Sequence, residues 1–243
     1  MSMIPTAPDG PLLPFDRNCI QADLMERENR FVVTAFHDGR LIRAHCNNSG
    51  SMLGLIRPGT RVILSPASNP RRKLPYTLEA VSGNGHWIGV NTQAPNKLLE
   101  AAFHAGRLKG ARHYEGFQRE VKRNRSRFDA LLTAKGRSRL WVECKNVTLV
   151  EEDIAYFPDA VTLRGQKHLE ELMEVVAAGE RAAMFYLVQR PDGRCLGPAD
   201  FIDSRYAELF WQAADSGVEI WAYEGVVTPD GVDLGEPLPL AQR

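Results

Sequence analysis

The stretch Trp141-Val142-Glu143-Cys144-Lys145 places apolar and charged side chains at alternating positions. Successive side chains of a β-strand point to opposite faces, so Glu143 and Lys145 share one face and lie about 6.5–7 Å apart along the strand. Val142 and Cys144 point the other way, toward an apolar layer. The stretch therefore predicts a strand that carries an acid and an amine side by side.

The residues before this strand complete a predicted β-hairpin. Strand character runs from Phe128 to Thr133 and from Arg139 to Val150, with Ala134-Lys135-Gly136 between them. If the turn is centred on Gly136, antiparallel pairing sets Asp129 opposite Glu143, with Cβ atoms about 5 Å apart. Two carboxylates this close repel each other unless a cation lies between them.

This arrangement suits phosphodiester hydrolysis with a divalent metal. Mg²⁺ (or Mn²⁺) takes a few carboxylate oxygens together with water and substrate phosphate, so Asp129 and Glu143 are the predicted metal ligands. The bound metal would acidify its water, and Lys145 would orient that water and stabilise the charged transition state. Glu120, before the first strand, could add a metal contact. The alternative is a solvent-facing hairpin whose Asp, Glu and Lys form cross-strand ion pairs of at most about 1 kcal/mol.

The rest of this half alternates helices and strands, and predicts a second domain at 89–243. A helix is expected at Asn96 to Phe103, since its spacing is helical and Gly106 can end it. The remaining predicted elements are a helix at Thr162 to Ala178, a strand at Ala182 to Val188, a helix at Ser204 to Ala214 and a final strand at Val218 to Tyr223. The elements follow one another in the order hairpin, helix, strand, helix, strand. This order predicts a mixed sheet flanked by helices, an α/β (α+β) fold.

The first third predicts a separate β domain, at 1–88. The turn signals are Asp38-Gly39, Pro58-Gly59 and Gly83-Asn84-Gly85. Predicted strands lie between them, at Phe31 to Phe36, Leu41 to Cys46, Arg61 to Leu64, Tyr76 to Val81 and His86 to Val90. Four or five short strands favour a small barrel or sandwich, and an OB-like barrel, which often binds nucleic acid, is one such fold.

Composition indicates a cytoplasmic globular protein without membrane association. No apolar run approaches the roughly 20 residues that cross a bilayer, and Met1 to Pro14 lacks the features of a signal peptide. The four cysteines are far apart and form no C-x-x-C pair, which favours reduced thiols.

The net charge of zero conceals a segregation along the chain. Residues 39–78 hold seven Lys/Arg and no acid, and residues 104–145 hold twelve Lys/Arg against four acids, whereas residues 146–243 hold seven against eighteen. Local positive fields attract polyanions, so DNA is the predicted partner. The alternative is a set of solvated charged faces.

Three groups are candidate nucleic-acid-binding residues. The first is the loop cluster Arg71, Arg72 and Lys73. The second, next to Asp129, is Lys122, Arg123, Arg125 and Arg127. The third is the polar turn with His45 and Asn48. Each can instead be a loop or surface that satisfies its own charge and hydrogen bonds.

Two resemblances add to this interpretation. Asp129, Glu143 and Lys145 resemble the D-(x)n-E-x-K pattern, PD-(D/E)XK, of the restriction-endonuclease-like superfamily. From about residue 15 to 235 the chain resembles the sugar fermentation stimulation protein A family. The stretches that carry this second resemblance are Arg30-Phe31, His45-Cys46-Asn47-Asn48-Ser49-Gly50, Val90-Asn91-Thr92, Ser126-Arg127-Phe128-Asp129, Val142 to Leu149, Phe157 to Thr162, Arg164 to Leu169, Gly217 to Ile220 and Ala222-Tyr223.

The resemblance implies a bacterial protein with an N-terminal OB-like domain and a C-terminal nuclease-like domain. It also implies DNA binding and a role in regulating sugar (maltose) metabolism. Gln166 and Lys167 fall on the helix where the superfamily often places a further active-site residue, so Lys167 joins the expected catalytic set. Two functions stay open: a Mg²⁺-dependent deoxyribonuclease, or a non-catalytic, sequence-nonspecific DNA-binding regulator that keeps the nuclease fold. Oligomeric state is also open, with a homodimer as one candidate.

Overall fold

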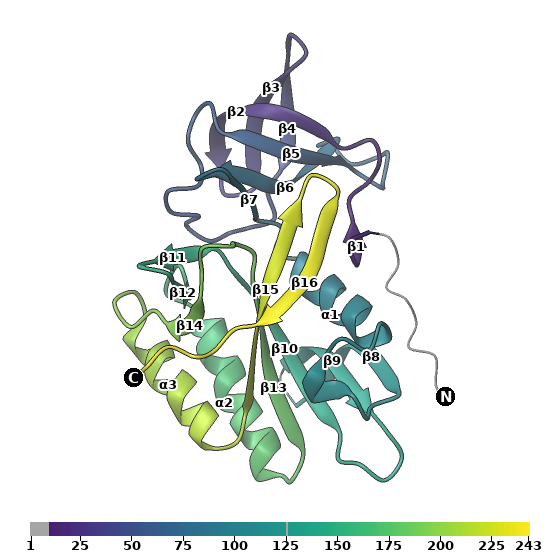
Figure 1. The fold of residues 1–243 in the computed structure, drawn as a ribbon, viewed down its shortest axis with the longest axis vertical. Coiled ribbons are helices and arrows are strands. Elements are labelled where there is room, and N and C mark those ends of the chain that lie inside the picture. Colours follow the sequence, from purple (N-terminus) through teal and green to yellow (C-terminus); the bar gives the residue numbers. More distant parts are fainter. Residues whose placement is uncertain (1–9, 125) are drawn as a thin grey trace.

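The computed structural model describes residues 10–124 and 126–243. A six-stranded sheet occupies the first third of the chain, and a seven-stranded sheet with helices on both faces occupies most of the remainder (Figure 1). The mixed α/β fold expected from the sequence is confirmed. In the described residues, no helix is long and apolar enough to cross a membrane.

The first sheet closes into an OB-like barrel, as the sequence predicted. Its spatial order is β4-β3-β2-β5-β6-β7, and β4 also pairs with β6 through Ala44↔Tyr76 and His45↔Thr77. The strands are β2 Ile20–Asn29, β3 Val32–His37, β4 Arg40–His45, β5 Arg61–Pro66, β6 Tyr76–Gly83 and β7 His86–Gly89.

The sequence analysis missed one barrel strand, β2. Ala22 and Leu24 on this strand are buried, whereas Gln21 and Asp23, which alternate with them, are exposed. This alternation with a period of two is the strand signal that was overlooked. The two predicted hairpin turns were correct, because Asp38-Gly39 and Asn84-Gly85 all have positive φ.

The second sheet has the order β1-β16-β15-β13-β10-β9-β8. Its centre is parallel, with β10 against β13 and β13 against β15, while the strands at both edges are antiparallel. The strands are β1 Leu13–Pro14, β8 Gly116–Arg123, β9 Ser126–Thr133, β10 Leu140–Val147, β13 Arg181–Val188, β15 Glu219–Thr228 and β16 Gly231–Pro237.

Helices cover both faces of this sheet, so β10 is buried on both sides. One face packs on α1 Ala94–His104, and the other packs on α2 Leu163–Ala177 and α3 Ser204–Asp215 (Figure 1). Thr162 caps α2, because its hydroxyl accepts a hydrogen bond from the Gly165 amide at 3.1 Å. The contacts of His168 with Glu143 and Lys145 place this end of the helix against β10.

Several elements differ from the sequence expectation. The strand expected to run to Val150 ends at Val147, and the strand at Val218 to Tyr223 is not the final one, because β16 follows it. The edge strand β8 was also missed. Short segments β11 Leu149–Glu151, β12 Ile154–Phe157 and β14 Cys195–Pro198 form a third sheet, and η1 Lys109–Ala111 is a short 3₁₀ helix.

The start of the chain does not stay with the barrel. Leu13 and Pro14 pair with Val232 and Gly231 of β16, so β1 joins the second sheet rather than the unit expected at 1–88. Residues 1–9 lie outside the described residues. The barrel itself uses residues from Ile20 to Gly89, and α1 begins soon after it, at Ala94.

Hydrogen bonds join the barrel to the second unit at three places. The amide of Gly89 donates to the Gln189 carbonyl at 3.1 Å. The amide and hydroxyl of Thr92 donate to the Asn47 side chain and carbonyl, each at 3.2 Å. The amide of Met52 donates to the Asp159 carboxylate at 3.2 Å. We call this boundary between the two units, marked by Gly89, Thr92 and Met52, the seam.

Candidate functional site

The β9–β10 hairpin has the register that the sequence predicted. Leu140 pairs with Leu132, Trp141 with Leu131 and Val142 with Ala130. The ladder ends there, one pair short of Glu143 and Asp129. In its place, the Cys144 amide donates to the Asp129 carboxylate at 2.8 Å. Asp129 therefore lies where β9 separates from β10.

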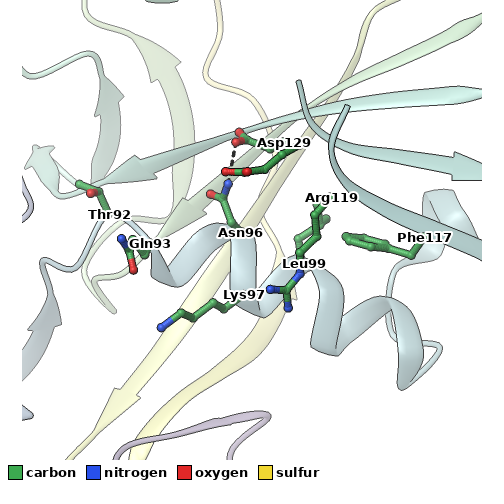
Figure 2. A pocket seen from close by; sticks show the side chains of 9 residues that line it. Thr92, Gln93, Asn96, Lys97, Leu99, Phe117, Arg119 and Asp129 are labelled. Carbon is green, nitrogen blue, oxygen red and sulfur yellow. Dashed lines mark hydrogen bonds between the residues drawn. The ribbon is translucent and has the colours of Figure 1, made fainter. Parts of the chain in front are cut away.

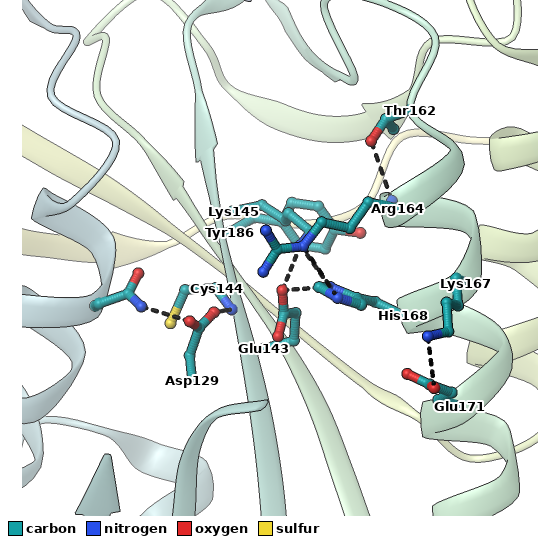
Figure 3. Close-up of polar contacts among 12 residues, drawn as sticks. Asp129, Glu143, Cys144, Lys145, Thr162, Arg164, Lys167, His168, Glu171 and Tyr186 are labelled. Carbon is teal, nitrogen blue, oxygen red and sulfur yellow. Dashed lines mark hydrogen bonds and ion pairs between the residues drawn. The ribbon is translucent and has the colours of Figure 1, made fainter. Parts of the chain in front are cut away.

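Glu143 and Lys145 lie side by side, on the face of β10 that packs against α2. The Lys145 ammonium is 2.7 Å from Glu143 Oε1. His168 of α2 contacts the same oxygen through Nδ1, and that nitrogen is 3.2 Å from Lys145 Nζ (Figure 3). Glu143 is only 3% exposed. The three side chains thus form a buried charged cluster.

The two oxygens of Glu143 are in different environments. Burial raises the pKa of this carboxyl, but Lys145 and His168 outweigh burial and lower the pKa to about 2. Glu143 is therefore ionised, with Lys145 and His168 both at Oε1. Among the described residues, the buried Oε2 has no hydrogen-bond partner. Leaving a buried acceptor unsatisfied costs about 1–3 kcal/mol, so this oxygen marks an incomplete site.

Asp129 accepts hydrogen bonds from two sides, and burial and the charge of Glu143 raise its pKa. Asn96 of α1 donates to Oδ1 at 2.6 Å (Figure 2), and the Cys144 amide donates to Oδ2 (Figure 3). Burial and the negative charge of Glu143 raise the Asp129 pKa, against the opposing effect of these hydrogen bonds and Lys145. A cation bound between the two carboxylates would relieve this electrostatic repulsion.

Two cavities flank these groups along the seam. The first, of about 460 Å³ and called the Asp129 pocket, lies between α1 and β8 (Figure 2). The second, of about 490 Å³ and called the Lys145 pocket, lies between the barrel turn Asn47–Gly50 and the segment before α2. Thr92 lines both cavities. The site is therefore approached from two sides.

The two further expected catalytic residues differ in position. Glu120 lies within β8 rather than before the first strand, has φ +53°, and lines the Asp129 pocket while pairing with Arg127 at 3.3 Å. Lys167 is exposed on α2, and its ammonium lies 3.5 Å from Glu171 (Figure 3). Its neighbour Gln166 donates to Asp203 at 2.9 Å.

His168, which the sequence analysis did not select, takes the place expected of Lys167. The signal was present, because α2 buries one stripe of residues at helical spacing. That stripe is Gly165, His168, Leu169, Leu172 and Val175. A histidine on an otherwise apolar face that packs against the strand of Glu143 indicates a polar partner across the interface.

The loop cluster of the barrel divides into free and bound cations. Arg71 and Lys73 are exposed. Arg72 instead donates to the Leu74 carbonyl at 2.7 Å and to the Thr77 hydroxyl at 2.9 Å, so it braces its own loop. Arg71 and Lys73 keep the geometry for DNA contact, whereas Arg72 has a structural partner set.

The basic residues near Asp129 divide in the same way. Lys122 is exposed, and Arg127 pairs with Glu120. Arg123 pairs with Glu180 and lies over the Trp141 ring at 5.2 Å, so internal contacts occupy its charge. Arg125 lies outside the described residues.

The polar turn after β4 is internally satisfied. His45 Nδ1 lies 3.2 Å from the Phe31 carbonyl. Asn48 is buried, and its side-chain oxygen accepts from the Gly50 amide at 2.8 Å. Asn48 still lines the Lys145 pocket. The turn therefore forms part of the pocket wall, rather than offering free hydrogen-bond donors to DNA.

An OB-like barrel joined to an α/β domain with a nuclease-like fold defines the class of this protein. The family model described as "Sugar fermentation stimulation protein RE domain" matches residues 93–231, and "SfsA N-terminal OB domain" matches residues 25–90. The chain belongs to the sugar fermentation stimulation protein family, as the sequence resemblance indicated.

Relatives match over nearly the whole chain. A sugar fermentation stimulation protein homolog of Maridesulfovibrio salexigens is 54% identical over 233 residues, covering 95% of this chain and 98% of the relative. One from Syntrophobacter fumaroxidans is 53% identical over 227 residues, covering 93% and 87%. A solved structure of Pyrococcus furiosus SfsA in complex with Ca²⁺ is 25% identical, covers 95% of this chain and 99% of that one, and superposes with a TM-score of 0.87.

Proposed function

We propose that this protein is a cytoplasmic DNA-binding phosphodiesterase that uses a divalent metal held by Asp129 and Glu143. The observation that carries the proposal is the oxygen Oε2 of Glu143, which is buried and lacks a partner among the described residues. It belongs to an ionised carboxylate close enough to Asp129 to raise the pKa of that group. A ligand with positive charge would resolve both features.

The donor atoms suit Mg²⁺ or Mn²⁺. These ions prefer oxygen ligands and retain water and substrate phosphate in their coordination sphere. Asp129 and Glu143 would supply the protein ligands, since the described residues contain no larger cluster of His, Cys, Asp or Glu that could hold a metal ion. The Ca²⁺ named in the Pyrococcus furiosus structure takes the same class of oxygen donors.

The chemistry that such a metal supplies is neutralisation of phosphate charge and acidification of a water molecule. The chain's own residues do the remaining work. Lys145 adds a positive charge beside Glu143 and would stabilise the negative charge that develops on the phosphate. His168 and Lys145 both bind Oε1 of Glu143, which fixes that carboxylate and leaves Oε2 open. Asn96 and the Cys144 amide hold Asp129 in the same way.

DNA is the proposed substrate because exposed cations lie on both units of the molecule. Arg71 and Lys73 on the barrel, and Lys122 and Arg127 near Asp129, would contact the phosphate backbone without reading sequence. Two carboxylates beside these cations disfavour a purely binding role. Without a metal they would repel the phosphates that the cations attract.

The test is nicking of supercoiled plasmid and cleavage of labelled oligonucleotides with Mg²⁺ or Mn²⁺. The wild-type protein should cleave, while the Asp129→Ala variant should not, although it still binds DNA in a gel shift. Glu180→Gln, at a carboxylate outside the site, is the matched control and should cleave as wild type does. DNA binding without cleavage by any of the three proteins would instead support a non-catalytic regulator of sugar metabolism.

A further inference from the structure

The Lys145 pocket has a composition that the carboxylate site does not explain. Both units build its walls: Arg30 and the turn Asn47–Gly50 come from the barrel, while Lys145 and Arg164 come from β10 and α2. Arg30 lay outside the set of residues that the sequence singled out for binding DNA. Figure 3 shows the Arg164 side chain extending from α2 to the neighbourhood of Glu143 and Lys145.

The pocket has an excess of positive charge. Its cations are Arg30, Lys145 and Arg164, and its acid is Asp159. Asp159 is already occupied, because it accepts hydrogen bonds from the Met52 amide at 3.2 Å and the Ser51 hydroxyl at 3.4 Å. Arg30 and Arg164 are exposed, and neither pairs with a carboxylate in the described part of the chain, although Arg164 Nε lies 3.4 Å from His168 Nε2. Lys145 is paired with Glu143, so the two guanidinium groups without a carboxylate partner are the groups that favour a phosphate.

The seam that contains the pocket is closely packed at two glycines. A Cβ atom on Gly50 would collide with the Asp159 carboxylate, and one on Gly89 would collide with the Gln189 side-chain amide. The hydrogen bonds from Thr92 to Asn47 also cross the seam. Asp129 and Lys145 line cavities of about 460 and 490 Å³ at this seam. Cavities of roughly 300–1,000 Å³ are of the size that holds small ligands, on the scale of nucleotides.

The cavities follow one another along the seam. Thr92 is common to the Lys145 and Asp129 pockets, and Gln93 and Lys97 are common to the Asp129 pocket and a further cavity of about 260 Å³ beside Arg72. The three cavities are therefore arranged along the connection between the barrel and α1. Such a row of small cavities with cations suits an extended chain of nucleotides.

We propose that the seam binds an unpaired DNA strand, with a backbone phosphate held in the Lys145 pocket by Arg30 and Arg164. The inference rests on the proposed function and names its substrate class. Enzymes that act on a nucleotide inside a pocket take single-stranded substrate or extrude the nucleotide from the duplex, because a stacked base pair does not fit there. A duplex would contact the outer cations, whereas only an unpaired segment would reach Lys145.

The test is fluorescence anisotropy in EDTA with a labelled single strand and the same strand as a duplex. The full-length wild type should bind the single strand at least about 10-fold more tightly than the duplex. The double variant Arg30→Ala, Arg164→Ala should weaken single-strand binding about 10-fold or more. It should also reduce the slope of log affinity against log salt by about 0.7 for each phosphate that the variant no longer neutralises. Arg40→Ala, an exposed arginine of the same barrel outside the pocket, is the matched control, and thermal melting checks that each variant is folded.

The outcomes separate this inference from the proposed function. Equal affinity for single strand and duplex, with no effect of the double variant, overturns the inference even if a plasmid is cleaved. Preferential single-strand binding that depends on Arg30 and Arg164 supports it, even if no metal gives cleavage. With Mg²⁺ or Mn²⁺, cleavage confined to paired regions of a flapped oligonucleotide would also overturn it.

Discussion

Glu143 and Glu180 are two carboxylates that have the same low pKa but differ in whether both of their oxygens have hydrogen-bond partners. In each case burial raises the pKa and nearby donors lower it to about 2. Glu180 uses both oxygens: Arg139 and Trp141 donate to Oε2 at 2.6 and 2.9 Å, and Arg123 and Arg139 donate to Oε1. In Glu143 only Oε1 has partners, and the buried Oε2 has no hydrogen-bond partner among the described residues. A lowered pKa is therefore common to the two clusters, and the unsatisfied oxygen is the feature that separates Glu143 from Glu180.

The largest expected effect is on cleavage, and it separates the two clusters. Glu143→Gln removes the charge and one proposed ligand oxygen, so metal-dependent cleavage should fall more than about 100-fold. Glu180→Gln should leave cleavage by the folded protein within about 2-fold of wild type. Initial rates on a labelled oligonucleotide, at a temperature where both variants are folded, measure the difference. Equal losses in both variants would mean that Glu143 is only another structural carboxylate.

The second effect is stabilisation by metal. A ligand present at 100 times its Kd adds about 2.7 kcal/mol to the stability of the state that binds it. Addition of Ca²⁺, Mg²⁺ or Mn²⁺ should therefore raise the melting temperature of wild type and of Glu180→Gln. The rise should be absent from Asp129→Asn and Glu143→Gln. A rise that persists in both of those variants would locate the metal elsewhere.

The third effect concerns His168, a positioning residue that acts through Glu143. His168→Ala removes a partner of Oε1, so cleavage should fall by roughly 10–100-fold. The metal concentration that gives half-maximal cleavage should rise as well, which a general loss of stability would not cause. His168→Gln retains a donor and should recover part of the activity. An unchanged metal requirement in His168→Ala would argue for a packing role alone.

The smallest effect is on acid stability and concerns Glu180 only. The pKa of Glu180 is about 2 in the folded protein, below the ordinary value of 4.5. The contribution of the ionised Glu180 to stability is therefore complete above pH 4.5. The contribution is lost as pH falls from about 4.5 toward 2. Glu180→Gln should thus melt lower than wild type at pH 7, by about 2–4 °C for each kcal/mol of stability removed. The gap should close near pH 2 in thermal melts, and a gap that stays constant with pH would contradict this account.

Local sequence determined the register of the site. The period of two along Trp141 to Lys145 placed Glu143 and Lys145 on one face, and the turn at Gly136 fixed the pairing of β9 with β10. The alternating order of elements predicted the mixed sheet. These features depend on backbone periodicity and short turns, which neighbouring residues control. Ile20–Asn29 had the same kind of signal, so missing that strand was an error of interpretation rather than a limit of the sequence.

Only the tertiary structure decided which charges are free. Arg72 and Arg123 looked like DNA contacts, but one braces a loop and the other pairs with Glu180, 57 residues away in sequence. The buried contact of His168 with Glu143, the open oxygen Oε2 and the meeting of Arg30 with Arg164 in one cavity likewise depend on distant segments. The physical reason is that periodicity fixes the face on which a side chain lies, while burial and pairing depend on what packs against that face.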